Sequence, residues 1–534
     1  MTKFKRELAL AAAAVMAAGA MTCGAAEEGA KTKGETPKPK AYLVADAHLD
    51  TQWNWDIQTT IGQYVWNTIN QNLALLERYP EYVFNFEGGV KYAWMKEYYP
   101  REYELMKKYI AEDRWHICGS SWDATDALVP SVESALRNIM LGQVLYRQEF
   151  GVESTDIFLP DCFGFGWTLP TIANHCGLIG FSSQKLGWRH NNFHGNSRYP
   201  FNVGLWQGID GSRVMMAHGY GYGHRWDYED LTVSPLIKEH LAESPVNVVY
   251  NYYGTGDIGG SPSLTSVDAV ERAVNKKDGD IEIISAQSDR MYKDYLPYES
   301  HPELPVYDGE LLMDVHGTGC YTSQAAMKRY NRQNEQLGDA AERVSVMAEL
   351  LGTADYPSGK ITDAWKRFIF HQFHDDLTGT SIPRAYEFSW NDELLSLKDF
   401  ADVTTHGVSA VASRMDTRAK GTPVVLYNPL GFEVSTLVEV SVPAKARPAK
   451  ATVINDRGET AEAQVIGYAD GKATLLVDAE KLPANGMAVY DVRLSGKGKA
   501  PAETEANTLE NSRYRITFDP NGDITSLYDK TAGK

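Results

Sequence analysis

Short apolar runs alternate with amphipathic stretches from residue 41 to about residue 300. We predict strands from these runs, which cover residues 41–45, 82–86, 156–159, 178–182, 214–217 and 246–252. Strands that alternate with helical segments are typical of a parallel sheet with helices on its faces. The pattern therefore predicts a parallel-sheet, (β/α) barrel-like domain over residues 41–322. In such a domain, ligands gather beyond the carboxyl ends of the strands.

The pattern changes near residue 323, where apolar positions recur at helical spacing and strand signals become rare. Residues 324–352 and 362–373 are the clearest examples. Consecutive amphipathic helices bury their apolar stripes against one another most simply as a bundle. We predict a three-helix bundle domain over residues 323–415.

Beyond residue 416, apolar and polar residues alternate in segments separated by Pro, Gly and Asn. We predict strands at residues 424–427, 434–442, 473–477, 487–492 and 514–518, the last followed by a hairpin at Asn521-Gly522. This alternation is typical of antiparallel sheets that bury one face. We predict the start of a β-sandwich over residues 416–534, and we expect the sequence to end in mid-domain, so that this domain is truncated. The fold class is thus multidomain, α/β followed by α and then β.

The amino terminus has the composition of a secretory signal. Lys3, Lys5 and Arg6 precede an apolar run over residues 8–21, which small residues follow. The run is shorter than the ~20 residues that span a bilayer, so we predict a signal peptide over residues 1–26. Residues 27–40, rich in Lys, Thr and Pro, are predicted to be a disordered linker. We expect an exported protein, periplasmic or associated with the outer membrane, with Cys23 in a poor lipidation sequence as a weaker candidate anchor.

The composition disfavours several classes of partner and site. Of 534 residues, 43% are hydrophobic, which is enough for several buried cores. The formal charge of −18 disfavours nucleic acids and anionic membranes as partners, since both attract clustered Lys and Arg. The 5 cysteines show no CxxC spacing, so the sequence predicts neither a thiolate metal site nor a disulfide framework. A neutral substrate fits best.

Three segments contain residues suited to chemistry at strand or helix ends. In the first, Asp46, His48 and Asp50 alternate at the end of a predicted strand, so they would share one face, and His48 with Asp50 could form half of a metal site. A hydrogen-bonded structural His with a turn-forming Asp explains the same residues equally well.

The second segment places Asp161 just after the predicted strand 156–159, with Gly164 and Gly166 behind it. This is a suitable place for a reactive carboxylate, although Asp is also common in turns and helix caps. In the third segment, His371, His374 and Asp375 lie near the carboxyl end of the predicted helix 362–373, with the two histidines three apart on one face. Histidines are also favoured there as capping residues.

Taken together, the three segments resemble family 38 of the glycoside hydrolases, the α-mannosidases. That family has a His-x-Asp near its start, a catalytic Asp in an Asp-x-Phe-Gly context and a later sequence like QFHDILPGTSI. All three occur here in order. Further matching segments are residues 122–126, 130–134, 253–262, 321–324 and 427–430. The resemblance covers roughly residues 41–534, and family members usually continue for several hundred residues more.

The resemblance implies that His48, Asp50, Asp161 and His374 bind one divalent ion. Two imidazoles and two carboxylates suit Zn²⁺ best, and Co²⁺, Mn²⁺ and Ca²⁺ are also compatible. It further implies that Asp161 is the nucleophile of a retaining mechanism, in which a second carboxylate protonates the leaving oxygen.

We choose Asp314 as that acid/base, with Glu310 and Asp257 as competitors. The local match is altered, because many members have Arg-Gly-Thr where this chain has the sequence of residues 317–320. Trp53, Asp375 and Asp257 are the expected substrate-binding residues, with the Trp53 ring forming a wall under the sugar.

The implied substrate is terminal α-linked mannose in mannose-containing oligosaccharides or N-glycans, released through a covalent mannosyl-enzyme intermediate. The sequence leaves open the linkage, the aglycone and whether the chain forms a homo-oligomer. One alternative is a metal-dependent carbohydrate deacetylase, which also uses Asp and His at strand ends but would not need His374. Another is a non-catalytic glycan-binding protein that binds sugar with its aromatic rings.

Overall fold

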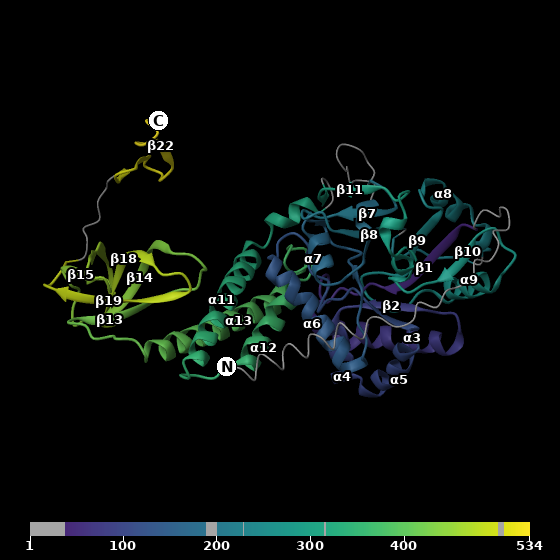
Figure 1. The fold of residues 1–534 in the computed structure, drawn as a ribbon, viewed down its shortest axis with the longest axis horizontal. Coiled ribbons are helices and arrows are strands. Elements are labelled where there is room, and N and C mark those ends of the chain that lie inside the picture. Colours follow the sequence, from purple (N-terminus) through teal and green to yellow (C-terminus); the bar gives the residue numbers. More distant parts are fainter. Residues whose placement is uncertain (1–37, 188–199, 220, 228, 314–316, 500–506) are drawn as a thin grey trace, which may run out of the picture. The chain divides into compact units, whose positions relative to one another are not determined.

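The structure is a computed structural model that describes residues 38–187, 200–219, 221–227, 229–313, 317–499 and 507–534 (Figure 1). Strands and helices alternate up to about residue 312, three long helices follow, and strands make up the rest. This order confirms the predicted fold class. The predicted signal peptide, Cys23 and nearly all of the linker lie outside the described residues.

The first sheet is built around strand β1 (Lys40–Ala47), whose residues from Ala41 onward are all buried. It is parallel to each of its partners, β2 (Phe84–Glu87), β9 (Val248–Thr255) and β10 (Glu282–Ser285), and β2 pairs in parallel with β3 (Trp115–Cys118). Parallel strands buried on both faces have continuous apolar sequences, which is how β1 was recognisable. Strands β3 and β10 were not predicted.

The second sheet has the order β11-β7-β8-β6-β4. Strands β4 (Asp156–Phe158), β6 (Gly180–Ser183) and β8 (Arg213–His218) are parallel, whereas β7 (Val203–Gln207) runs antiparallel to β8 and pairs with β11 (Val306–Asp308). Strand β3 lies beside β4, and β8 lies beside β9. The two sheets therefore approach each other along both edges, in the barrel-like arrangement expected from the sequence.

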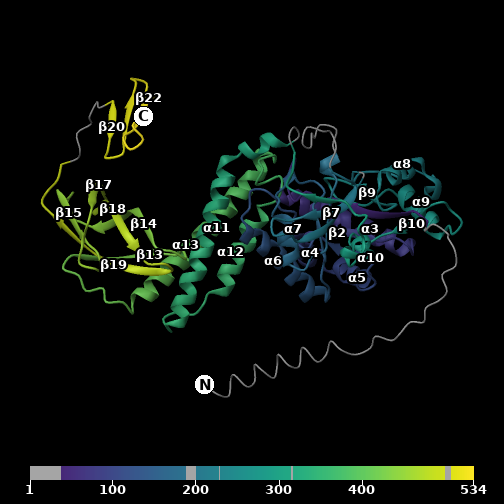
Figure 2. The same ribbon diagram turned by 45° about the horizontal axis from the view of Figure 1, so that its top comes forward.

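Helices cover the outside of the strands (Figure 2). The main ones are α3 (Trp66–Arg78), α5 (Pro100–Ala111), α6 (Val132–Phe150) and α9 (Leu264–Asn275). Helix α6 begins where the Ser131 side chain accepts a hydrogen bond from the Ser134 amide, and it ends at Gly151 in the left-handed conformation. Both are ordinary end signals, and Ser263 caps α9 in the same way.

The predicted three-helix bundle is present as α11 (Ala325–Leu350), α12 (Ser358–Phe370) and α13 (Pro383–Ala412). Its apolar core includes Trp365, Phe368 and Phe400. One expectation was wrong: α12 ends at Phe370, so His371 to Phe373 lie beyond it, because the chain there turns toward the α/β domain. Among the described residues, no helix combines the length and apolar character needed to cross a membrane.

The remaining strands form the predicted antiparallel sandwich. One sheet has the order β13-β19-β15-β16 and the other β14-β18-β17. Their bounds are Thr422–Asn428 for β13, Val434–Pro443 for β14, Lys450–Ile454 for β15, Thr460–Ala461 for β16, Ala463–Ala469 for β17, Lys472–Leu482 for β18 and Gly486–Ser495 for β19. Val453, Leu475 and Tyr490 from the two sheets share one core. Strands β20 (Thr508–Glu510), β21 (Tyr514–Phe518) and β22 (Ile524–Asp529) form a further sheet, with Gly522 at φ +90° in the predicted hairpin.

Candidate active site

His48 and Asp50 follow the carboxyl end of β1, and backbone pairing with the β9 segment holds both. The His48 amide donates to the Thr255 carbonyl at 3.1 Å, and the Asp50 amide donates to the Asp257 carbonyl at 2.9 Å. The extended pairing keeps alternate residues on one face, as the sequence predicted. Both side chains are buried, with at most 2% of either exposed.

His374 reaches the same place from the turn between α12 and α13. Its Nδ1 lies 3.0 Å from the Ala124 carbonyl oxygen, and its amide donates to that oxygen at 3.2 Å. A carbonyl only accepts hydrogen bonds, so Nδ1 must donate. The neutral ring then has its lone pair on Nε2, which is the arrangement found in most metal-bound histidines.

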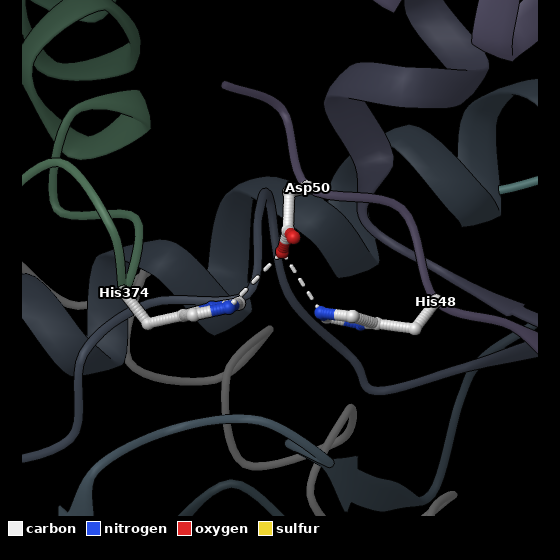
Figure 3. Close-up of side chains that lie close together, drawn as sticks. All are labelled: His48, Asp50 and His374. Carbon is white, nitrogen blue, oxygen red and sulfur yellow. Dashed lines mark ion pairs between the residues drawn. The ribbon is translucent and has the colours of Figure 1, made fainter. Parts of the chain in front are cut away.

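The three side chains converge (Figure 3). Asp50 Oδ1 lies 2.9 Å from His48 Nε2 and 3.3 Å from His374 Nε2. Each of the three residues offers one ligand atom, and these atoms all lie within 4.8 Å of one another. Within the described part of the chain, none of the three atoms has a hydrogen bond of acceptable geometry. Buried polar atoms without partners are rare, so their clustering fits a bound cation.

The electrostatic surroundings also favour positive charge at this point. Burial works against protonation of His48, but Asp50 and Glu87 outweigh it and raise the pKa of the ring to about 10. The pKa of His374 is raised as well, while the two histidines lower the pKa of Asp50 despite its burial. The carboxylates that favour positive charge on the two rings would also stabilise a divalent ion, which has to displace these protons when it binds. The donor set therefore fits Zn²⁺ or a similar cation.

Behind His48 lies a buried charged group that the sequence analysis did not identify. Glu87, at the end of β2, has Oε1 3.6 Å from His48 Nδ1 and 2.9 Å from Lys91 Nζ. Lys91 Nζ is also 3.7 Å from Asp123 Oδ1, and burial raises the pKa of Asp123 to about 6. The position of Glu87 at a strand end was the one available signal, and it is the same signal that selected Asp50 and Asp161.

Asp161 lies beyond the end of β4, at the open side of the cluster. Its Oδ2 is 4.0 Å from His374 Nε2, and its side chain is 11% exposed, compared with 2% for Asp50. Its other oxygen accepts from Lys185 Nζ at 2.5 Å and Gln184 Nε2 at 3.2 Å. Asp161 is thus adjacent to the three-residue group but outside its 4.8 Å limit. Neither Lys185 nor Gln184 was predicted, although both follow the buried strand β6.

The expected substrate-binding residues occupy different surroundings. Trp53 is half-buried and stacks edge-on against Trp55, with ring centroids 5.9 Å apart. Asp375 is buried, with Oδ2 3.8 Å from His374 Nε2 and a hydrogen bond from Thr380 to Oδ1. Burial, together with the charge of Asp50, raises the pKa of Asp375 to about 8. Asp257 is partly exposed and accepts a hydrogen bond from Tyr222, whose ring lies against His48 with centroids 4.9 Å apart.

Of the three candidates for the acid/base, the structure describes Glu310 and Asp257. Asp314 lies outside the described residues. Glu310 is exposed between β11 and the short strand β12 (Leu311–Leu312), and its backbone carbonyl accepts from Tyr307. Asp257 already accepts from Tyr222. The choice of Asp314 over Glu310 and Asp257 therefore stays a prediction.

One expectation from the sequence was wrong. His371 does not share a face with His374, because α12 has ended: its ring lies between Asp376, 2.9 Å from Nδ1, and Asp392, 3.2 Å from Nε2. These carboxylates overcome the effect of burial and raise the pKa of His371 to about 10. Asp46 is buried near His48 but is not part of the group of ligand atoms, since it belongs to the strand rather than to its end.

Fold and site together define a multidomain protein with a barrel-like α/β domain. Beyond the ends of its strands lies a buried His-Asp-His group beside Asp161, a carboxylate that is slightly more exposed. Residues 38–310 match the N-terminal domain of the family 38 glycosyl hydrolases, and residues 316–407 match the α-mannosidase middle domain. The chain belongs to glycoside hydrolase family 38.

Similar proteins include α-mannosidase G of Dictyostelium discoideum, which is 26% identical over 93% of this chain and 47% of its own length. Human α-mannosidase 2C1 is 27% identical over 92% of this chain and 44% of its own length. The crystal structure of an α-mannosidase from Enterococcus faecalis V583 has the same fold, with a TM-score of 0.73 at 19% identity, covering 93% of this chain and 61% of that one. The chain spans less than half the length of the two sequence relatives.

Proposed function

We propose that this chain is the catalytic part of a retaining α-mannosidase that removes terminal α-linked mannose from oligosaccharides or N-glycans. The main support is Asp161, the more exposed carboxylate beside the buried His48, Asp50 and His374. Family membership and the α-mannosidase names of the relatives support the choice of sugar.

His48, Asp50, Asp161 and His374 would hold one divalent ion, and Zn²⁺ is the best match to two imidazoles and two carboxylates. When bound, such an ion supplies electrostatic stabilisation near the sugar's hydroxyl groups and the nucleophile. The protein holds its ligands in place through the Ala124 carbonyl on His374 and through Glu87 beside His48. In mannose the 2- and 3-hydroxyls are cis, which favours manno over gluco substrates at a site that contacts both.

In the proposed reaction, an Asp161 oxygen attacks the anomeric carbon as the glycosidic C–O bond breaks. A second carboxylic acid, for which Asp314 is our choice, gives its proton to the leaving oxygen. In the second half, that carboxylate takes a proton from water while the water oxygen attacks the anomeric carbon. The Asp161 carboxylate is released, and the configuration is retained. Lys185 and Gln184 hold one Asp161 oxygen, so the other is presented to the substrate.

Trp53, Asp375 and Asp257 are the proposed sugar contacts. The half-buried Trp53 ring suits the apolar face of a pyranose, and the buried Asp375 carboxyl suits a hydrogen bond to a hydroxyl. Asp257, with φ +69° and a partly exposed side chain, would contact hydroxyls at the rim.

The test is hydrolysis of an aryl α-mannoside by purified protein before and after treatment with a chelator. We expect turnover that is lost on chelation, is restored by Zn²⁺ and gives α-mannose as the first product. Acetate release from acetylated sugars would instead support a deacetylase. Sugar binding without any product would support a glycan-binding protein, and either result would refute the proposal.

We also propose that the protein is bacterial and exported, on the strength of the amino-terminal charge and apolar pattern. Fractionation of cells expressing the whole chain, with mass spectrometry of the mature amino terminus, tests this. Cleavage near residue 26 is expected, and an uncleaved cytoplasmic protein would refute it. A lipid-modified Cys23 would identify outer-membrane association instead of a free periplasmic form.

A further inference from the structure

A buried carboxylate outside the ligand group joins the two parts of the chain that form it. Asp376 is fully buried in the turn after α12. It lies two residues beyond His374, in a segment whose other side chains reach the α/β domain. Its position raises the question of what a fully buried carboxylate does next to the site.

Four polar side chains surround Asp376. Oδ2 accepts from Gln52 Nε2 at 2.7 Å and from Ser389 Oγ at 3.2 Å, and it lies 2.9 Å from His371 Nδ1. Oδ1 accepts from Ser381 Oγ at 3.1 Å. The carboxylate is therefore fully satisfied, as a buried charge must be.

These partners come from different parts of the fold. Gln52 follows β1, two residues after Asp50, and its Nε2 also donates to Ser389 Oγ at 2.7 Å. Ser389 belongs to α13, and His371 is fixed to α13 through Asp392 at 3.2 Å. One carboxylate thus connects the segment of Asp50, the segment of His374 and helix α13.

Gln52 and Asp376 have the same spacing along the chain from a proposed ligand. Gln52 and Asp376 each lie two residues beyond a ligand, Asp50 and His374, whose reactive atoms are 3.3 Å apart. Two short segments that are linked by a side-chain hydrogen bond near the ligands have little freedom to separate. Without this bond the two segments would still be joined by the Ile382 amide to the Trp53 carbonyl at 2.8 Å and by Ser381 Oγ to the Gln52 carbonyl at 3.4 Å, but no side chain would connect Gln52 directly to Asp376.

We propose that Asp376 is a positioning residue, which through Gln52 sets the separation of Asp50 and His374 and thereby the cation affinity of the site. This rests on the metal site of the proposed function. Partners behind metal ligands typically change affinity by ~10–100-fold when they are removed.

The test compares Zn²⁺ affinity, measured by competition with a chromogenic chelator, in wild-type protein and in Asp376→Ala, Asp376→Asn and Gln52→Ala. We expect Asp376→Ala to weaken Zn²⁺ binding by ~10–100-fold. Asp376→Asn should lose less, because an amide oxygen still accepts from Gln52. The double variant Asp376→Ala/Gln52→Ala should lose less affinity than the product of the two single effects, because the bond between the two side chains is already lost in each single variant.

A second readout is the visible spectrum of the Co²⁺-loaded protein, which reports ligand geometry and which a loss of general stability does not change. Asp376→Ala should alter its band positions. The control is Phe400→Leu, which loosens the core at α13 without touching the polar group and should leave both affinity and spectrum unchanged.

Wild-type affinity and an unchanged Co²⁺ spectrum in folded Asp376→Ala and Gln52→Ala would overturn the proposal. So would an equal loss in Phe400→Leu. If wild-type protein binds the metal but hydrolyses no mannoside, the proposed function fails while this comparison still decides the role of Asp376. If wild-type protein binds no cation, both fail.

Discussion

Two kinds of interaction position the two halves of the candidate site. Main-chain hydrogen bonds between the carboxyl-terminal ends of β1 and β9 fix the positions of His48 and Asp50. His374 lies in a turn whose place is fixed by a main-chain bridge of Phe373 to Thr125 and by buried side chains such as Asp376 and Gln52.

The difference affects how each half responds to substitution. A ladder of backbone bonds persists when a neighbouring side chain is shortened, because every residue type offers the same amide and carbonyl. A side-chain network depends on each member, since losing one leaves another buried polar group without a partner. The strand half should therefore be robust, and the turn half should be sensitive.

The largest effect is expected at Asp161, which follows strand β4 and is the proposed nucleophile. Asp161→Asn keeps the size of the side chain but removes the nucleophile and a proposed ligand, so aryl mannoside turnover should fall by at least ~10³-fold. The stabilisation of the protein by Zn²⁺ should be lost at the same time.

The rate is measured with saturating Zn²⁺, and thermal unfolding is followed with and without the metal. Asp308→Asn, at an exposed position on β11, is the matched control and should keep the wild-type rate. A near-normal rate for Asp161→Asn would show that its assigned role is wrong.

The substitution Leu43→Ala tests whether the backbone pairing of β1 keeps His48 and Asp50 in place. Leu43 lies in the middle of β1 and is fully buried. The cavity should reduce the free energy of unfolding by ~2–5 kcal/mol, as measured by urea denaturation. Because the backbone pairing remains, Zn²⁺ affinity of the folded protein should stay within ~3-fold of wild type. A loss of affinity comparable to that expected for Asp376→Ala would remove the contrast between the halves.

Asp161 differs from His48 and Asp50, because the side chain of Lys185, and not only backbone pairing, holds it in place. Lys185→Met removes the ammonium 2.5 Å from Asp161 Oδ1, and kcat should fall ~10–100-fold with a smaller change in KM. Lys185→Arg should recover most of the rate, which a general packing defect would not. The measurement is steady-state kinetics on the wild-type protein, Lys185→Met and Lys185→Arg. Equal kcat values for the two variants would argue against a role of Lys185 in positioning Asp161.

The smallest effect concerns the helices that support the turn half. Burial raises the pKa of Glu393 from 4.5 to about 8, despite a hydrogen bond from Asn334. Between these values the unfolded chain loses a proton that the folded protein keeps, so stability falls as pH rises through this window. Glu393→Gln should abolish that slope and stabilise the protein by ~1–3 kcal/mol at pH 8.

Urea denaturation at pH 5 and pH 8 measures this change. The exposed Glu387→Gln on the same helix serves as the control and should retain the wild-type dependence on pH. A Glu393→Gln protein that is equally destabilised at both pH values would mean that the carboxyl contributes mainly through its hydrogen bond.

Much of the fold could be predicted because periodicity is a local property. The buried run of β1, the long α11 and α13, and the alternating β14 all appear in the sequence as patterns over five or more residues. Strands of three to five residues carry little pattern: β2, β4 and β6 were predicted, whereas β3, β7 and β10 were missed. The end of α12 was set too late, because Phe373 continues the apolar spacing although its ring is used by a turn.

The sequence by itself placed His48, Asp50 and Asp161 at strand ends and His374 near a helix end, and its resemblance to a known family selected these four as the candidate ligands. Only the tertiary structure decided that His48, Asp50 and His374 converge, that Lys185 holds Asp161, and that His371 faces Asp376 instead of the ligand group. The reason is physical. Local patterns follow from the bonding of neighbours along the chain, whereas these contacts join segments more than 300 residues apart, join residues beyond the ends of two adjacent strands, or depend on one turn. The geometry of these contacts depends on how buried polar groups fit together, which the hydrophobic periodicity of the sequence does not encode.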